Sequence, residues 1–172
     1  MIRFECDYLE GAHPRILEAL TTTNFEQTPG YGMDTYCEKA RSIIKEKCNS
    51  QESDVHFLVG GTQTNTTVIA SILRPHQGVL CASTGHINVH ETGAIEATGH
   101  KVMSIPSDDG KITALDIQNA YESHFNDDTA EHMVQPGMVY ISHPTENGTL
   151  YTKKELEAIS YVCHKLSLPL FL

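Results

Sequence analysis

Basic residues are scarce in this sequence: 12 Lys and Arg stand against 22 Asp and Glu in 172 residues, a formal net charge of −10. Nucleic-acid binding needs clustered basic side chains to neutralise phosphates, so this composition argues against it. Long apolar runs are also lacking, and none approaches the ~20 residues that cross a bilayer. The opening MIRFECDYLEG does not have the basic-then-apolar layout of a signal peptide. We therefore expect a protein that binds neither nucleic acid nor membrane.

Paired cysteines are lacking as well. The five cysteines are odd in number and no two have the CxxC spacing; they are Cys6, Cys37, Cys48, Cys81 and Cys163. This pattern argues against a disulfide framework or a zinc ribbon, and it predicts reduced thiols and a cytoplasmic location. Hydrophobic residues make up 40% of the chain, enough for a folded core.

Short apolar runs predict the strands of this fold. They cover residues 55–59, 79–83, 101–105, 138–142 and 168–172, and several are apolar at successive positions, as in a parallel sheet buried on both faces. Helical spacing occurs near residues 36–48, 64–73, 113–125 and 156–166. Asp34 is a good N-cap, Thr152 and Glu155 have capping-box spacing, and Pro14 suits the first turn of an opening helix. Strands alternating with helices predict an α/β fold with a mainly parallel sheet and flanking helices.

A glycine-rich turn follows the first predicted strand. Gly60-Gly61-Thr62-Gln63 leads into a predicted helix, and the N-terminus of a helix offers free backbone N–H groups and a positive dipole to a phosphate. Gly61 would let the backbone approach closely, while Thr62 and Gln63 could donate further hydrogen bonds. The turn matches neither GxGxxG nor the Walker pattern, so a tight structural connection is an equal alternative.

A histidine cluster follows the next predicted strand, with His86, His90 and Glu91 close in sequence. Ligands of open parallel sheets gather beyond the carboxyl ends of the strands, where this cluster would lie. Two histidines four residues apart can bind zinc, although no third ligand has a characteristic spacing. Alternatively, one imidazole stacks on an aromatic ligand and Glu91 orients it or caps a helix. An ordinary histidine satisfied by local hydrogen bonds is the third interpretation.

A third polar cluster, residues 142–149, follows the fourth predicted strand with the sequence SHPTENGT. It would place Glu146 at the same edge of the sheet. The plain alternative is a polar turn that only starts the following helix.

In this order, these segments resemble the threonine aldolase / β-eliminating lyase family of pyridoxal-phosphate (PLP) enzymes. The matching stretches are CDYLEGAHP (6–14), GYGMD (30–34), GGTQTN (60–65), HINVHETGA (86–94), PTENGT (144–149) and LPLF (168–171). The resemblance implies an aspartate-aminotransferase-like large domain. It further implies that the 172 residues comprise an N-terminal segment and a truncated large PLP-binding domain, without the small C-terminal domain.

The resemblance also implies roles for single residues. Gly61, Thr62 and Gln63 would hold the PLP phosphate, and His86 would stack on the pyridine ring as the catalytic-site imidazole. Asp7, Tyr31 and Glu146 would border the amino-acid substrate; they are named here by resemblance alone. No metal is implied, and family members form homo-oligomers, dimers or tetramers, with Tyr31 reaching a neighbouring subunit's site.

The implied activity is cleavage of the Cα–Cβ bond of a 3-hydroxy amino acid to glycine and an aldehyde. Two departures leave the substrate open: Cys6-Asp7-Tyr8 stands where many relatives have Ser-Asp-Asn, and Glu146 aligns with a histidine of many threonine aldolases. The family's ring-pairing aspartate would follow Leu172, and its cofactor-binding lysine lies further on, so we expect this chain alone to be inactive. Competing hypotheses are a non-catalytic PLP- or phosphate-binding module and a metal-dependent hydrolase using His86, His90 and Glu91.

Overall fold

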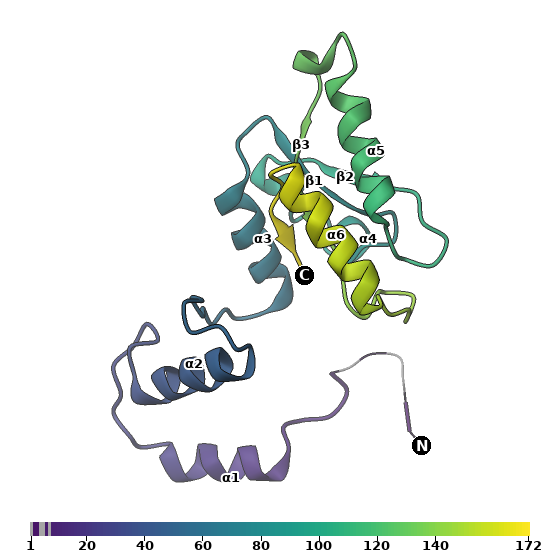
Figure 1. Ribbon diagram of the computed structural model, residues 1–172. Helices are drawn as coiled ribbons and strands as arrows, with labels where there is room; N and C mark the ends of the chain where they lie inside the picture. Colours follow the sequence, from purple (N-terminus) through teal and green to yellow (C-terminus); the bar gives the residue numbers. More distant parts are fainter. Residues whose placement is uncertain (1, 4–5, 7) are drawn as a thin grey trace. The chain divides into compact units, whose positions relative to one another are not determined.

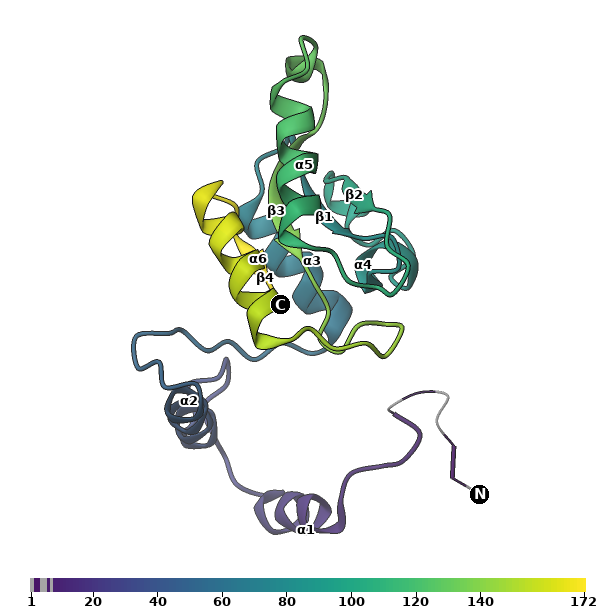
Figure 2. The ribbon, with the colours of Figure 1, turned by 45° about the vertical axis from the view of Figure 1, so that its right-hand side comes forward.

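The computed structural model describes residues 2–3, 6 and 8–172 (Figures 1 and 2). The chain divides into two compact units, Met1–Phe57 and Leu58–Leu172.

The N-terminal unit contains two helices, α1 (Pro14–Thr23) and α2 (Thr35–Lys47). Proline occupies the first turn of α1, as predicted, since that position needs no N–H donor. Asp34 caps α2 by accepting a hydrogen bond from the Cys37 backbone N–H at 2.9 Å, also as predicted. Arg41 donates from Nη1 to the Gly32 carbonyl at 2.7 Å, which joins α2 to the preceding loop. Neither helix contains a fully buried residue.

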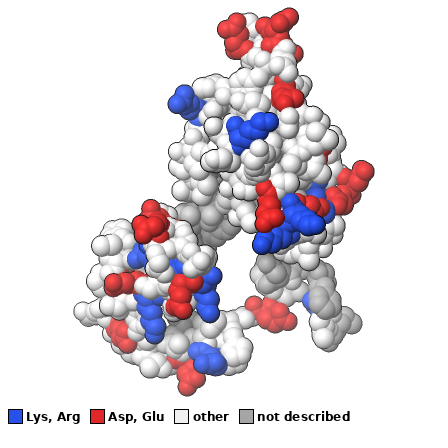
Figure 3. Space-filling model, viewed as in Figure 1, with Lys and Arg blue, Asp and Glu red and all other residues white. Residues whose placement is uncertain are grey.

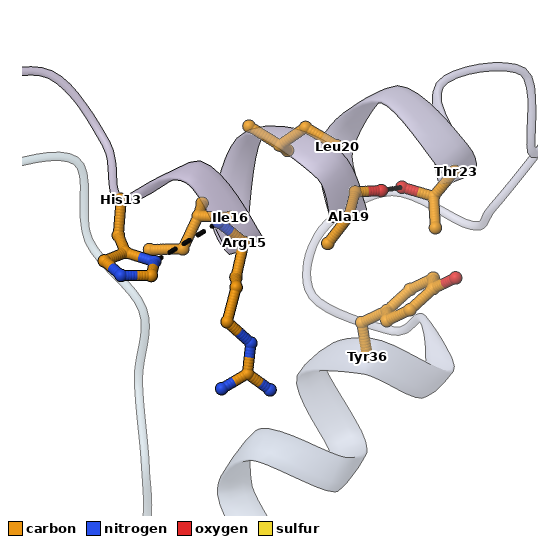
Figure 4. Close-up of a pocket in the computed structure, with 7 residues that line it drawn as sticks. All are labelled: His13, Arg15, Ile16, Ala19, Leu20, Thr23 and Tyr36. Carbon is orange, nitrogen blue, oxygen red and sulfur yellow. Dashed lines mark hydrogen bonds between the residues drawn. The ribbon is translucent and has the colours of Figure 1, made fainter.

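A groove of about 680 Å³ runs along α1 in this unit (Figure 4). Its lining is mostly apolar, and the residues that contribute are His13, Arg15, Ile16, Ala19, Leu20, Thr23 and Tyr36. Three of the polar groups drawn there have partners close by: His13 Nδ1 accepts from the Arg15 backbone N–H at 3.2 Å, Thr23 Oγ1 donates to the Ala19 carbonyl at 2.9 Å, and Tyr36 OH donates to Glu26 Oε2 at 2.6 Å. The guanidinium of Arg15 is the remaining polar side-chain group of this lining.

The C-terminal unit is built on a four-stranded parallel sheet in the order β2-β1-β3-β4. The strands are β1 (Gln77–Ala82), β2 (Val102–Ile105), β3 (Gln135–Tyr140) and β4 (Leu170–Phe171). Four of the predicted apolar runs therefore supply strands. Helix α3 (Gly61–Ile72) precedes β1. The crossovers contain α4 (His86–Val89), α5 (Ala114–Phe125) and α6 (Lys153–Lys165), with short 3-10 turns at Glu96–Thr98 and Ala130–His132.

Both faces of the sheet are buried, because successive strand residues point to opposite sides. Leu80 and Ala82 join one core cluster with residues of α5 and α6, which lie side by side in both ribbon views. Val79 and Cys81 join the other cluster, with residues of α3 and α4. The unit is thus a three-layer α/β sandwich. The capping box predicted at Thr152 is present at the start of α6.

The prediction of a strand at residues 55–59 is wrong. These residues have no regular secondary structure, and Val59 is 94% exposed. A strand requires a neighbour for its backbone hydrogen bonds, and this segment pairs with neither edge strand of the sheet, β2 or β4. Apolar composition alone does not reveal whether such a neighbour exists.

Among the described residues, none of the helices has the length and apolar character needed to traverse a bilayer. Acidic and basic side chains are interspersed on the face drawn in Figure 3, so the excess of acidic residues forms no single continuous patch there.

Candidate functional site

A pocket of about 400 Å³ lies at the carboxyl edge of the sheet in the C-terminal unit. Three chain segments line it: the first turns of α3, the start of α4 after β1, and the end of β3 with the loop that follows. The lining residues are Gly61, Asn65, His86, Tyr140, Ser142, Pro144, Thr145 and Glu146. Because β1 and β3 are neighbours, the loops that follow them meet at this edge, where open α/β sheets bind ligands.

The N-terminus of α3 is open to an anion. Its N-cap, Gly60, provides no side-chain hydrogen bond, so the first N–H groups of the helix are left to other partners. A methyl group at Gly60 or Gly61 would meet no atom within 4 Å, which shows that the space beside the turn is free. Gln63 has a local task, because its Oε1 accepts from the Val59 backbone N–H at 2.9 Å. The turn therefore fits a phosphate group.

His86 is the first residue of the single-turn helix α4. Its side chain is 45% exposed, and its Nδ1 lies 2.7 Å from Glu91 Oε1. The ring of His90 lies nearby, with centroids 5.5 Å apart and planes tilted by 52°. His86 thus presents a partly exposed imidazole, held at one nitrogen, to the same pocket as Gly61.

Glu91 is a buried carboxylate behind this imidazole, and its side chain has no exposed surface. Oε1 also accepts from Asn65 Nδ2 at 2.5 Å, which connects α3 to α4. Oε2 is buried, and the part of the chain that the structure describes provides no hydrogen-bond partner for it. Of the two tasks considered for Glu91 from the sequence, the structure supports orienting His86.

Glu146 connects the two loops that flank the pocket. Its Oε1 accepts from the His86 backbone N–H at 2.7 Å and from Ser142 Oγ at 2.6 Å. Ser142 in turn lies 3.1 Å from Tyr140 OH. Burial raises the pKa of Tyr140, and the charges of Glu146 and Glu91 add to the rise, so this phenol remains neutral near pH 7.

The structure brings together Gly61, His86 and Glu146 of the residues predicted for the site. Thr62 and Gln63 lie beside Gly61 on the exposed first turn of α3 but do not line the pocket. Tyr31 belongs to the N-terminal unit, where it is fully exposed with a φ of 61°. Asp7 lies outside the described residues.

Two lining residues escaped the sequence analysis. Tyr140 was interpreted only as part of a buried strand. Its polar hydroxyl at the carboxyl end of that strand could have indicated a place in the pocket. Asn65 follows Gly61 by four residues, a spacing that places both on one helix face.

In the described part of the chain, no three His, Cys, Asp or Glu residues are placed so that they could hold a metal ion together. His86 and His90 lie one turn apart, since the His90 backbone N–H donates to the His86 carbonyl at 2.9 Å, but Nδ1 of His86 is engaged by Glu91.

Residues 7–172 match the model of a family described as "Beta-eliminating lyase". A low-specificity L-threonine aldolase of Pseudomonas sp. (strain NCIMB 10558) is 29% identical over 98% of this chain, which covers 48% of that protein. The chain thus spans about half the length of the curated relatives it matches.

Solved structures give the same result. The structure of Leishmania major threonine aldolase is 48% identical, with a TM-score of 0.91 over 96% of this chain and 47% of that one. An archaeal alanine:glyoxylate aminotransferase, 17% identical with a TM-score of 0.71 over 91% of this chain and 40% of that one, shares the fold alone. The expected aspartate-aminotransferase-like architecture is confirmed. From the family match and the pocket at its expected edge of the sheet, the chain belongs to the β-eliminating lyase family.

Proposed function

We propose that this chain forms the phosphate- and ring-binding part of a PLP-dependent lyase. In the intact enzyme, that lyase would cleave the Cα–Cβ bond of a 3-hydroxy amino acid to glycine and an aldehyde. One observation carries the proposal: the open N-terminus of α3 and the imidazole of His86 line one pocket at the carboxyl edge of the sheet. Matched relatives that are threonine aldolases support the choice of reaction.

The chain's own residues have three tasks in this proposal. The first N–H groups of α3, at Gly61 and Thr62, bind the phosphate through hydrogen bonds and the helix dipole. The exposed face of His86 stacks on the cofactor ring. Glu146 borders the substrate, with Oε1 held by two donors.

PLP, when bound, supplies the electron sink that stabilises negative charge at Cα of an amino acid. Covalent attachment of PLP requires a lysine. Among the described residues that line the pocket there is no lysine. We therefore infer that the 172 residues alone bind PLP without catalysing the lyase reaction. A non-catalytic PLP- or phosphate-binding module is therefore the second candidate function, and this same observation favours it.

Binding is tested with pyridoxamine 5′-phosphate, which has no aldehyde and so cannot react with surface lysines. We expect the chain to bind it about tenfold more tightly than pyridoxamine, since the helix N-terminus contributes on the order of 1–2 kcal/mol to an anion. Gly61→Ala should weaken phosphate-dependent binding without loss of stability, because its methyl group meets no protein atom. Gly11→Ala, equally free of contacts, is the matched control. Equal affinity for the two probes would refute the phosphate site.

Catalysis is tested separately by incubating the chain with PLP and reducing with borohydride. We expect no stoichiometric adduct at a single lysine and no aldehyde released from L-threonine or other 3-hydroxy amino acids. An adduct at one lysine, or aldehyde release, would contradict the inferred inactivity. Cytoplasmic location and a homodimer or homotetramer are part of the same proposal for the intact enzyme, supported by the family resemblance.

A further inference from the structure

The buried carboxylate of Glu91 has no part in the proposed binding of phosphate, ring or substrate. It lies behind the pocket and touches His86 and Asn65 through one oxygen, Oε1, at 2.7 and 2.5 Å. A carboxylate placed out of water is costly unless hydrogen bonds satisfy it. A group with no exposed surface, placed against the imidazole, therefore calls for an explanation beyond ordinary packing.

Hydrogen-bond directions define what Glu91 does to the imidazole. The Asn65 amide nitrogen can only donate, so Oε1 is an acceptor. An ionised carboxylate has no hydrogen to give, and the Nδ1 of His86 must then carry the proton of their shared bond. The same holds if a proton resides on Oε2, for which the described residues offer no hydrogen-bond partner, because Oε1 is then a carbonyl oxygen. In a neutral imidazole, Nε2 is left bare. Only a proton on Oε1 itself would let Glu91 donate to Nδ1, and that arrangement gives the opposite tautomer.

We propose that Glu91 is a positioning residue that holds His86 in its Nδ1–H tautomer with the ring at one orientation. Through Asn65, the same oxygen ties that ring to α3, the helix whose N-terminus faces the phosphate. The imidazole then has an unprotonated Nε2, for which the described residues provide no hydrogen-bond partner, on a side chain that is 45% exposed and lines the pocket. This Nε2 is a ready acceptor for a hydroxyl or N–H group of a bound amino acid, a last step that rests on the proposed function.

The tautomer is measured in the 172-residue chain by two-bond ¹⁵N–¹H correlation spectra of its histidines, without any ligand. His86 is assigned by its loss in His86→Gln. At a pH where the imidazole is neutral, we expect Nδ1 protonated and Nε2 bare, with a bias of about tenfold or more from a bond to a charged acceptor. A His86 that is protonated mainly at Nε2 would overturn the proposal, and this arm needs no variant of Glu91 to fold.

The variant Glu91→Gln replaces the carboxylate with an amide that can either accept from or donate to the ring. We expect the Nε2–H tautomer to become readily detectable, while Glu96→Gln, at an exposed position five residues further on, leaves the tautomer unchanged. If Glu91 has a purely structural role, Glu91→Gln will lower the stability of the chain and leave the His86 tautomer unchanged. That result refutes the proposal.

Binding of pyridoxamine 5′-phosphate separates this inference from the proposed function. If His86 has the expected tautomer but the probe does not bind, the proposed function fails and the positioning role remains. If the probe binds and the tautomer is the opposite one, the positioning role fails alone. Where both hold, Glu91→Gln should weaken binding by about fivefold or more through loss of a preorganised ring.

Discussion

Removing the Glu146 carboxylate should loosen both loops that flank the pocket. Its Oε1 accepts two short hydrogen bonds, from the His86 backbone N–H at 2.7 Å and from Ser142 Oγ at 2.6 Å. These partners lie after different strands, β1 and β3. The carboxylate therefore acts as a link between segments that are 60 residues apart in the sequence.

The magnitude follows from these two bonds. Hydrogen bonds to a charged group contribute about 1.5–3 kcal/mol each, and we take about 1–1.5 kcal/mol because the Glu146 side chain is only half-buried. Glu146→Ala should then lower the free energy of unfolding by about 2–3 kcal/mol. Glu146→Gln keeps an acceptor oxygen and should cost about 1 kcal/mol, while Ser142→Ala, which removes one of the two donors, should also cost about 1 kcal/mol.

Urea unfolding followed by circular dichroism measures these differences. A double-mutant cycle of Ser142→Ala and Glu146→Ala should give a coupling energy of about 0.5–1.5 kcal/mol, since the two side chains touch. Glu157→Ala is the matched control, because this glutamate is 63% exposed and pairs with Lys153 only on the surface. Its removal should change the free energy of unfolding by no more than about 0.5 kcal/mol. If Glu146→Ala proves no more destabilising than this control, the linking role is refuted.

Three further outcomes are expected. The hydrogen bond from Lys111 lowers the pKa of Glu155 from its ordinary 4.5 to about 2; the pair therefore stabilises the fold above pH 4.5 and loses this contribution as the pH falls toward 2. Glu155→Gln should flatten the decline of Tm in that interval, and an unchanged decline would contradict the pairing. Burial raises the pKa of the Cys81 thiol to about 12, so a thiol reagent at pH 8 should modify exposed Cys48 first and Cys81 only on unfolding, as peptide mapping will show. Gly78→Ala should cost about 1–3 kcal/mol in urea unfolding, because its methyl group would lie 2.6 Å from a backbone carbonyl oxygen; a cost below 0.5 kcal/mol would show that the sheet yields there.

Local features of the chain were readable from the sequence because their causes are local. Thr152 and Glu155 form a capping box within four residues, and Asp34 caps α2 from the adjacent position. Four of the five apolar runs form strands, since burial on both faces of a parallel sheet imposes successive apolar residues. His86 could be placed near a ligand because it follows strand β1 at its carboxyl end. Gly61 could be placed there because it begins a helix after a glycine-rich turn, although the strand expected before that turn does not form.

The contacts that build the pocket were decided only by the tertiary structure. Asn65 and Glu91 are 26 residues apart, and His86 and Glu146 are 60 apart. His86 and Glu146 meet because β1 and β3 are neighbours, and Asn65 and Glu91 meet because α3 and α4 pack against the same face of the sheet. No local pattern specifies either arrangement. Residues 55–59 also show the effect of tertiary structure. Their composition suits a strand, but no neighbouring strand offers them backbone hydrogen bonds. Local sequence patterns are enough to locate the helices and most of the strands, whereas the long-range pairing of strands sets which polar groups share a site.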